Sequence, residues 1–219
     1  NNYIKYANMP EVFFGIENKN TSWILGAGGE IKKIVPRTST NIGGATFKVN
    51  ESLLSYAGIV YAQYSHSLLS IKTKTTYGQN LSDVSMLGGY AVSGLDTISG
   101  QQNYSAFNMI SAWLNITYGK KWQVGLFAGF TQNLGTNKPL YEKQAVLSIY
   151  GNGVSGNQMI GAMYKVSPQL SYNLNNFRVG LEYDYTLAEW GDVTANDGVV
   201  RNAKNVLNHR LLGFIAYYF

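Results

Sequence analysis

The sequence predicts an all-β protein, a transmembrane antiparallel β-barrel with about nine strands in this chain. Apolar and polar residues alternate with a period of two along most of the chain, and the connections between the alternating segments are short and long in turn. Only 13% of the residues are charged, against roughly 25% in typical globular proteins. In a barrel, apolar residues that face lipid alternate with polar residues that face the lumen, which accounts for both the pattern and the composition.

No stretch approaches the roughly 18 consecutive apolar residues that a membrane helix needs. The chain contains 24 Gly, 17 Tyr and no Cys. The missing cysteines fit an envelope protein that does not depend on disulfides. We expect residues 1–219 to form a single β-barrel domain.

The alternation is clearest in residues 177–188, where the odd positions are apolar and most even positions are polar. Consecutive side chains of a strand point to opposite faces, so Leu181 and Glu182 lie on different faces. A soluble sandwich would bury the apolar face against a second sheet, whereas a barrel presents it to lipid. We expect lipid to contact the face of Val179, Leu181 and Tyr183, and the lumen to contact the face of Arg178, Glu182 and Asp184.

Nine strands are predicted when the chain is read back from its C-terminal end. One of them contains Pro168, which cannot donate a hydrogen bond to the ladder, so we expect a β-bulge there. The predicted strands span residues 205–219, 177–188, 159–172, 122–133, 104–118, 68–80, 46–64, 22–35 and 10–18.

The predicted connections alternate in length, as they do in outer-membrane barrels, which have short periplasmic turns and long extracellular loops. Aromatic residues gather beside the short connections and predict an aromatic belt at the periplasmic interface. Ordinary enrichment of aromatic residues in strands is the alternative explanation. The short connections are 18–21, 65–67, 119–121 and 173–176, the long ones are 36–45, 81–103, 134–158 and 189–204, and the aromatic residues are Trp23, Tyr64, Tyr118, Trp122, Tyr172 and Phe177.

The final strand ends on Phe219, with Tyr217 two positions before it and mainly apolar or small residues at every second position. This pattern resembles the last-strand signal that barrel assembly machinery reads in outer-membrane proteins. We therefore expect Tyr217 and Phe219 to act as an assembly signal.

An odd number of strands raises the question of closure, because single-chain bacterial barrels have even numbers. Residues 1–7 form a short tenth strand, or the chain is the C-terminal part of a larger barrel. Seven residues span only about 23 Å, whereas a tilted membrane strand needs about 9–11 residues. We therefore expect the chain to be incomplete as a barrel.

Four stretches together resemble the C-terminal half of a porin family of Bacteroidetes-type bacteria, similar in plan to the trimeric DcaP-like porins. The resemblance implies a barrel of roughly sixteen strands, with further strands supplied by an N-terminal half, and either that missing half or a homotrimer as partner. It also implies passive transport without a catalytic motif. The stretches are residues 6–37, 77–90, 115–136 and 166–191.

The chemistry-bearing residues predict neither an enzyme nor a cofactor or metal site. His66 and His209 have no second histidine or cysteine at ligand spacing, and solvated surface roles are expected for both. The 17 basic residues are scattered, so no nucleic-acid partner is expected. Glu182 and Asp184 are more simply explained as charge-balancing groups beside Arg178 than as a general acid–base pair.

Pore-lining residues follow from the parity of each strand. We expect Lys165 and Arg178 to face each other across the 173–176 hairpin, and one of the loops 81–103 or 134–158 to fold inward. The excess of basic over acidic positions suggests a mild preference for anions such as small carboxylates, with simple solvation of the lumen as the alternative. The pore-lining residues are Lys32, Lys72, Lys74, Lys165, Arg178, Glu182, Asp184 and Arg210.

The leading functional hypothesis is a porin of the bacterial outer membrane, through which small hydrophilic solutes diffuse passively. The alternative is a non-transporting barrel that serves as an anchor, an adhesin or a structural subunit of an envelope complex. The expected partners are outer-membrane lipid and lipopolysaccharide, the barrel assembly machinery and small solutes.

Overall fold

The structure is a computed structural model that describes residues 6–84, 86–141, 146–147 and 158–219. It is built from β-strands, with one short 3-10 turn, η1 (Leu81–Val84). In the described residues, no helix is long and apolar enough to cross a membrane. The strands are β1 (Val12–Lys19), β2 (Trp23–Ile34), β3 (Ser39–Ile42), β4 (Ala45–Lys48), β5 (Leu53–His66), β6 (Leu69–Gln79), β7 (Tyr90–Leu95), β8 (Gln102–Gly119), β9 (Trp122–Thr136), β10 (Val146–Leu147), β11 (Gln158–Leu174), β12 (Phe177–Val193) and β13 (Val200–Tyr217).

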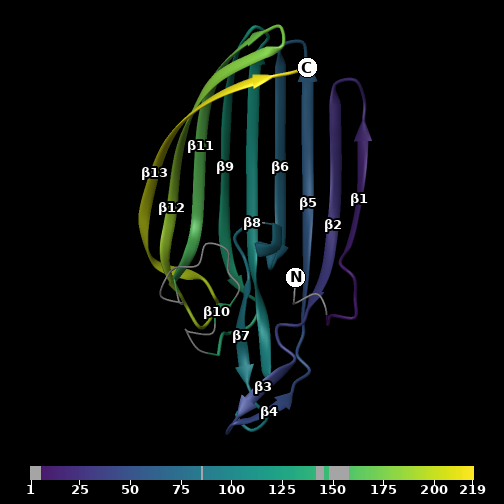
Figure 1. The fold of residues 1–219 in the computed structure, drawn as a ribbon, viewed down its shortest axis with the longest axis vertical. Helices are drawn as coiled ribbons and strands as arrows, with labels where there is room; N and C mark the ends of the chain where they lie inside the picture. The colour runs from purple at the N-terminus through teal and green to yellow at the C-terminus, as the bar shows by residue number, and fades with distance from the viewer. Residues whose placement is uncertain (1–5, 85, 142–145, 148–157) are drawn as a thin grey trace.

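Nine long strands form one antiparallel sheet in the order β1-β2-β5-β6-β8-β9-β11-β12-β13, which follows the order of the sequence (Figure 1). The short strand β7 continues the edge of β8 beyond β6, and β10 pairs with β7. The β3-β4 hairpin forms a separate two-stranded sheet. β1 and β13 are the two edges of the long sheet, and the described strands do not close into a barrel.

The predicted all-β, antiparallel architecture is confirmed, and each of the nine predicted long strands is present with altered ends. The predicted strand 46–64 is wrong at its beginning, because residues 45–48 turn back on β3 and β5 starts only at Leu53. The predicted long connection 189–204 is also too long, since β12 and β13 extend the hairpin to a turn at 194–199. Residues 1–7, considered above as an alternative tenth strand, lie largely outside the described residues.

The bulge expected at Pro168 is wrong. Val166 pairs with Tyr185 and Gln169 with Glu182, so the register of β11 on β12 is the same on both sides of the proline. The ladder to β9 runs unbroken through the pair of Pro168 and Leu126. Proline therefore removes pairing toward one neighbour without shifting the register. The irregularity of β11 lies instead between residues 160 and 162.

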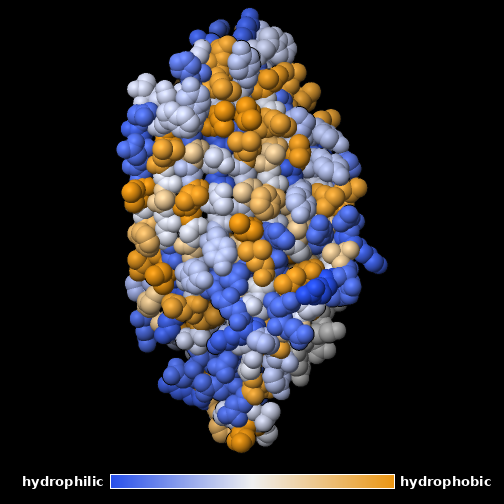
Figure 2. Space-filling model, turned by 180° about the vertical axis from the view of Figure 1, so that it is seen from behind, coloured by the Kyte–Doolittle hydropathy of each residue, from blue (hydrophilic) through white to orange (hydrophobic). Residues whose placement is uncertain are grey.

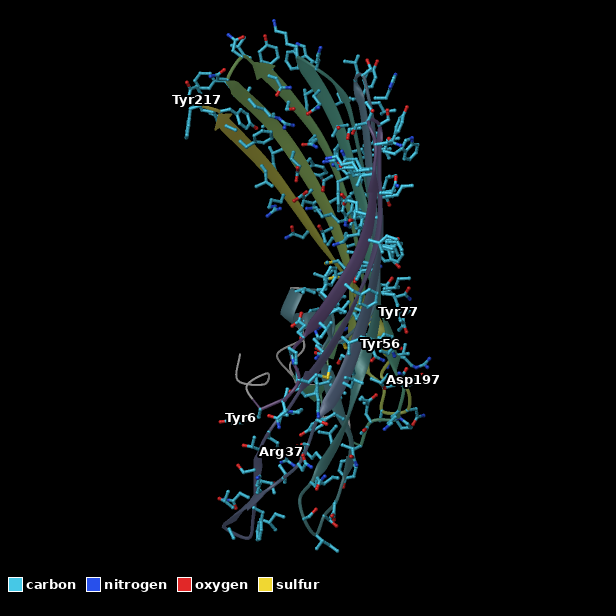
Figure 3. All side chains as sticks on the ribbon, turned by 90° about the vertical axis from the view of Figure 1, so that its right-hand side faces the viewer. Tyr6, Arg37, Tyr56, Tyr77, Asp197 and Tyr217 are labelled. Atoms are coloured by element: carbon cyan, nitrogen blue, oxygen red, sulfur yellow. The ribbon has the colours of Figure 1, made fainter. Side chains whose placement is uncertain are left out.

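The sheet is strongly bent. In the side view, the end of β13 marked by Tyr217 swings away from the first strands, and the short η1 ribbon lies on the side toward which the sheet bends (Figure 3). Short turns lie at one end of the sheet, while β3, β4, β7 and β10 lie at the other (Figure 1). The long connections therefore share one end, which is called the loop end here.

One face of the sheet is apolar and exposed, and it is called the apolar face. Leu181 on β12 is 56% exposed and Ile215 on β13 is 78% exposed. Hydrophobic residues cover much of the surface over the upper part of the molecule, and hydrophilic residues gather toward the loop end (Figure 2). In water such a face would be costly, since soluble proteins rarely expose apolar patches of more than a few hundred Å².

Aromatic pairs mark the short-turn end of the apolar face. Each pair joins directly opposed residues of neighbouring strands, and their ring centroids lie within the range of favourable aromatic contacts. Such pairs are expected where a belt sits at a membrane interface. The pairs are Trp23 with Tyr64 at 4.6 Å, Trp122 with Tyr172 at 4.7 Å and Phe177 with Tyr217 at 4.8 Å.

Candidate functional site

The opposite face of the sheet carries most of the charged strand residues and is called the polar face. Strand register connects its members, because directly opposed residues share a face. Lys74 lies opposite Tyr61 and Trp113, Trp113 lies opposite Gly129, and Gly129 lies opposite Lys165. All eight predicted pore-lining residues lie on this face: Lys32, Lys72, Lys74, Lys165, Arg178, Glu182, Asp184 and Arg210.

Asp184 is the centre of the densest charge cluster on the polar face. Its carboxylate pairs with Lys165 Nζ at 3.0 Å and accepts a hydrogen bond from Arg210 Nε at 3.0 Å. The Ser167 hydroxyl donates a further hydrogen bond to it. Two cations surround one buried carboxylate, so this cluster carries a net charge of +1.

Arg178 lies nearer the short turns and has a different environment. Its guanidinium donates to Gln123 Oε1 at 2.8 Å and to Ser171 Oγ at 3.2 Å. It also stands over the ring of Phe214, with 5.6 Å between the guanidinium carbon and the ring centroid. These neutral partners hold the guanidinium on the polar face, and no carboxylate of the described residues forms an ion pair with it.

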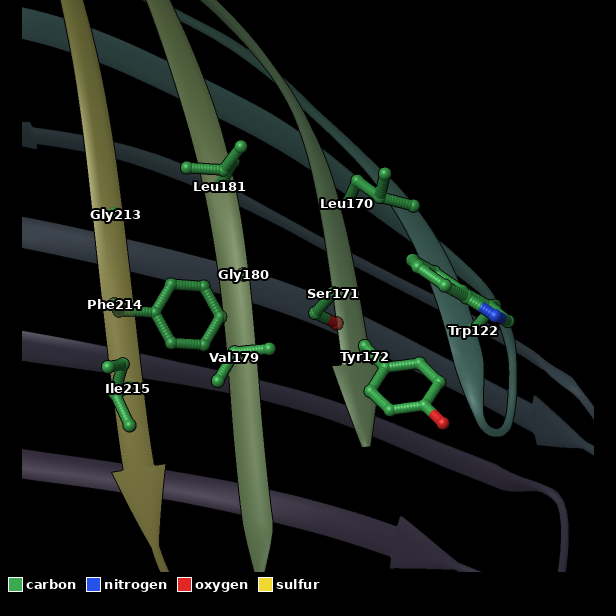
Figure 4. Close-up of a pocket in the computed structure, with 10 residues that line it drawn as sticks. All are labelled: Trp122, Leu170, Ser171, Tyr172, Val179, Gly180, Leu181, Gly213, Phe214 and Ile215. Carbon is green, nitrogen blue, oxygen red and sulfur yellow. The ribbon is translucent and has the colours of Figure 1, made fainter. Parts of the chain in front are cut away.

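The ring of Phe214 itself packs over a glycine. A Cβ on Gly180 would lie 2.5 Å from the ring, so only glycine fits beneath it. The close-up shows Phe214 extending from β13 toward Gly180 on β12, with Leu181 and Leu170 on neighbouring strands (Figure 4).

Lys72 and Lys74 are the least compensated cations among the described polar-face residues. Lys72 lies between Gln63 and Asn115, and Lys74 lies between Tyr61 and Trp113. In the described part of the chain, neither lysine has a carboxylate within ion-pair distance.

The remaining predicted pore-lining residues are differently placed. Lys32 is buried and contacts Glu30 at 3.6 Å. Glu182 lies opposite Gln169 and Leu212.

The expected facing of Lys165 and Arg178 is wrong. Lys165 lies opposite Thr186, and Arg178 lies opposite Asn173 beside the turn. The hairpin register places these two cations at different levels of the strands, because each residue pairs with the one equally distant from the turn. The two cations therefore do not form one continuous stripe.

The connection between β6 and β7 packs against the polar face. Leu81 and Leu87 join a buried cluster with Met109, and Ala57 packs against it. Met109 lies opposite Gly78 and Ala57 also lies opposite Gly78, so all three belong to the polar-face parity. A Cβ on Gly78 would lie 3.0 Å from Leu81 Cδ2, so the glycine admits the leucine closely.

A second cluster, called the loop-end clamp, fixes the connections beyond the sheet. The guanidinium of Arg37 donates to both carboxylate oxygens of buried Glu51, at 2.7 and 2.8 Å. The backbone N–H of Gln102 and the hydroxyl of Tyr104 also donate to Glu51. Burial acts to raise the pKa of Glu51, but these donors outweigh it and the pKa is lowered. Arg37 lies far from the short turns (Figure 3).

The two histidines and the two residues of the expected assembly signal lie within strands or close to the ends of strands. His209 Nδ1 lies 2.7 Å from the Tyr183 hydroxyl on the apolar face, and His66 ends β5. In the described ranges, no group of three or more His, Cys, Asp or Glu residues could hold a metal ion. Tyr217 ends β13, and the ring of exposed Phe219 lies 6.0 Å from it.

The sequence alone did not predict the loop-end clamp or a hollow that lies beside Gly129 on the polar face. Arg37 and Glu51 are 14 residues apart, and Tyr104 is 53 residues beyond Glu51. Periodicity carries no information on such contacts. Gly129 lay within a predicted strand, but only the register shows which side chains surround it.

The described strands form a bent antiparallel sheet with an apolar exposed face, a charged opposite face and long connections at one end, a combination typical of the wall of a transmembrane β-barrel. No family model matches the sequence, and no curated protein matches it. A solved structure similar to this chain is OmpT, an outer membrane protein of Vibrio cholerae, with a TM-score of 0.50 and 12% identity. The match covers 93% of this chain and 54% of that protein, so the chain spans about half the length of OmpT.

Proposed function

We propose that this chain forms part of the wall of an outer-membrane porin through which small hydrophilic solutes diffuse passively. The observation that carries the proposal is the charged polar face, on which Lys72 and Lys74 stand without carboxylate partners in the described residues. A face that only needed to pack would bury such charges against partners or replace them with apolar residues. Lumen walls instead keep charges in contact with water, where they select ions by sign.

The balance of charge supports a mild preference for anions. The Asp184 cluster contributes a net positive charge, and Arg178 and the two lysines on β6 add further cations. A narrow pore focuses the field of such groups and raises the local concentration of anionic solutes. The packing of Leu81 and Leu87 on the polar face supports this proposal, because side chains placed there narrow the space in front of the face.

One observation favours a second candidate, a non-transporting barrel that acts as an anchor or structural subunit. Near the loop end, buried Phe107 and Met159 extend the apolar cluster of Leu81, Leu87 and Met109. Apolar packing of this kind fills space that a wide pore would leave to water. The two candidates differ in conductance, because a filled barrel passes no ions while a porin does.

The test is the conductance of the full-length protein, extracted from outer membranes and inserted into planar bilayers. Reversal potentials across a salt gradient are measured for the wild type and for the double variant Lys72→Gln/Lys74→Gln. Lys33→Gln is a matched control, because Lys33 lies next to a polar-face residue in the strand and therefore on the other face.

We expect a conducting wild type with a mild anion preference that the double variant reduces and the control retains. Absence of conductance in correctly folded protein would favour the non-transporting barrel. A cation-selective wild type would refute the anion preference. An unchanged reversal potential in the double variant would show that Lys72 and Lys74 do not contribute to ion selectivity.

A further inference from the structure

A hollow interrupts the polar face at Gly129. Directly opposed residues place Trp113 on one side of this glycine and Lys165 on the other. Along the same strand, Phe127 and Thr131 lie two positions before and after it, on the same face. The glycine is thus surrounded on four sides by larger side chains and has none of its own.

Rings fill the space above two other glycines of this face, Gly26 and Gly180, whereas the contacts at Gly129 are longer. A Cβ on Gly26 would lie 2.1 Å from the Tyr61 ring, and one on Gly180 would lie 2.5 Å from the Phe214 ring. A Cβ on Gly129 would lie 3.0 Å from the Cβ of Trp113 and 3.2 Å from the tip carbon of the Phe127 ring. A hollow remains beside Gly129, between Trp113, Phe127 and Lys165.

The hollow has a volume of about 150 Å³, and its lining also includes Ser111, Ala112, Phe130 and Met163. The indole of Trp113 and the ring of Phe127 form one aromatic wall, with centroids 6.1 Å apart and planes inclined by 31°. An apolar cavity of about 150 Å³ accommodates benzene, so the volume matches a single six-membered aromatic ring. The lining is apolar and aromatic, which favours a planar ring over a chain of polar groups.

Two polar side chains that line the hollow, Thr131 and Lys165, can make further interactions with a ligand. Thr131 is 8% exposed, and its Oγ1 has no hydrogen-bond partner among the described residues. Such an unpaired buried hydroxyl is costly unless a ligand or water satisfies it. Lys165 Nζ pairs with Asp184, but the lysine side chain keeps 34% of its surface exposed.

The local charge attracts an anion. Arg210 also pairs with Asp184, so the carboxylate does not cancel both cations. On the other side of the aromatic wall, Lys74 lies opposite Trp113 without a carboxylate partner in the described residues. A carboxylate in the hollow would meet positive charge from two directions.

We propose that the hollow at Gly129 is a binding subsite for small aromatic carboxylates, compounds in which one planar ring bears one carboxylate. The ring packs beside Gly129 against the aromatic wall of Trp113 and Phe127, and the carboxylate pairs with Lys165 and accepts a hydrogen bond from Thr131. The inference rests on the proposed function in one respect, since it takes the polar face to be accessible to solutes.

The test measures binding without transport. The full-length protein, extracted folded from outer membranes into detergent, is titrated with benzoate and followed by ligand-observed saturation-transfer NMR. Benzyl alcohol keeps the ring without the charge, acetate keeps the charge without the ring, and glucuronate replaces the aromatic ring with a sugar. Heat-modifiable mobility on gels verifies folding of each variant.

We expect benzoate to bind about tenfold more tightly than benzyl alcohol or acetate, because each of these lacks one of two contacts. Gly129→Ala should weaken benzoate binding by about tenfold, because a methyl group occupies the hollow. Thr131→Val and Lys165→Gln should each weaken it by about threefold to tenfold, through loss of one polar contact. Lys33→Gln, a charge change on the other face of the sheet, should leave it within about twofold.

Equal binding of benzoate by the wild type and the folded Gly129→Ala variant would overturn the proposal. If that variant does not fold, unchanged binding in Thr131→Val and Lys165→Gln would do so. Glucuronate bound more tightly than benzoate would refute the aromatic ligand class. A protein that binds benzoate but passes no ions would retain the subsite and refute the porin, whereas a conducting protein with no benzoate binding would give the reverse result.

Discussion

A charge placed at position 181 tests the assignment of the two faces most directly. Leu181 is exposed on the apolar face, opposite Leu170 and Gly213, and Glu182 is the next residue on the polar face. If lipid covers the apolar face, Leu181→Arg places an arginine in hydrocarbon. Glu182→Arg places the same side chain in the lumen, one residue further along the same strand.

The position of Leu181 in the strand sets the expected magnitude. It lies four residues beyond Phe177, where β12 begins at the aromatic belt. At about 3.3 Å per residue and a tilt of about 40°, this corresponds to about 10 Å along the membrane normal. An apolar band about 25 Å tall puts that level near the midplane, where arginine costs about 2–4 kcal/mol. The folded-to-unfolded ratio should therefore fall by roughly 30-fold to several hundred-fold.

The assay is urea unfolding in lipid vesicles, with the folded fraction read from heat-modifiable gel mobility. Leu181→Ala separates loss of the leucine from gain of the charge. We expect Leu181→Arg to be far less stable than both Leu181→Ala and Glu182→Arg. Equal damage from the two arginine variants would refute the assignment of lipid and lumen faces.

Three further outcomes are expected. The loop-end clamp should be fully formed above the ordinary pKa of glutamate, about 4.3, and it should be lost as the pH falls through the lowered pKa of Glu51. Limited proteolysis of residues 35–52 at neutral and acid pH measures this loss. The variant Glu51→Gln should remove the pH dependence. Gly88→Ala should displace residues 81–90 and raise single-channel conductance, because a Cβ there would lie 2.6 Å from the backbone nitrogen of Leu81. Trp122→Ala should cost about 0.5–1.5 kcal/mol of unfolding free energy in vesicles through loss of its ring contact, whereas a change of less than a few tenths would argue against the aromatic belt.

Much of the sheet could be predicted because apolar and polar side chains alternate with a period of two along a strand that has two different faces. In β12, each odd residue from Val179 to Tyr183 is apolar, and the register then assigns every neighbour to a face. Strand ends were predicted less well where the apolar alternation stops before the pairing does. β12 continues to Val193 because backbone pairing with β13 outlasts the alternation.

Features that depend on contacts between distant segments could not be predicted. The β3-β4 hairpin breaks a stretch that alternates like a strand, and two glycines with positive φ, Gly43 and Gly44, make its turn. Inward packing was expected of one of two loops: part of the connection 81–103 packs on the polar face through the fit of Leu81 against Gly78, and most of the connection 134–158 lies outside the described residues. The hollow at Gly129 likewise requires the register of three strands, which no single segment contains.

The two faces of each strand contribute differently to stability and to the proposed solute preference. In the proposed barrel wall, residues of the apolar face determine stability in lipid, because each would be exposed to hydrocarbon on one side of a single-layered wall. Residues such as Lys72 and Lys74 contribute little to that stability, since they have no ion-pair partner in the described residues whose loss would leave a buried charge. Substitutions on the polar face can therefore alter charge and shape without unfolding the sheet. Asp184 is the exception, because its removal would leave Lys165 and Arg210 side by side without a counter-ion.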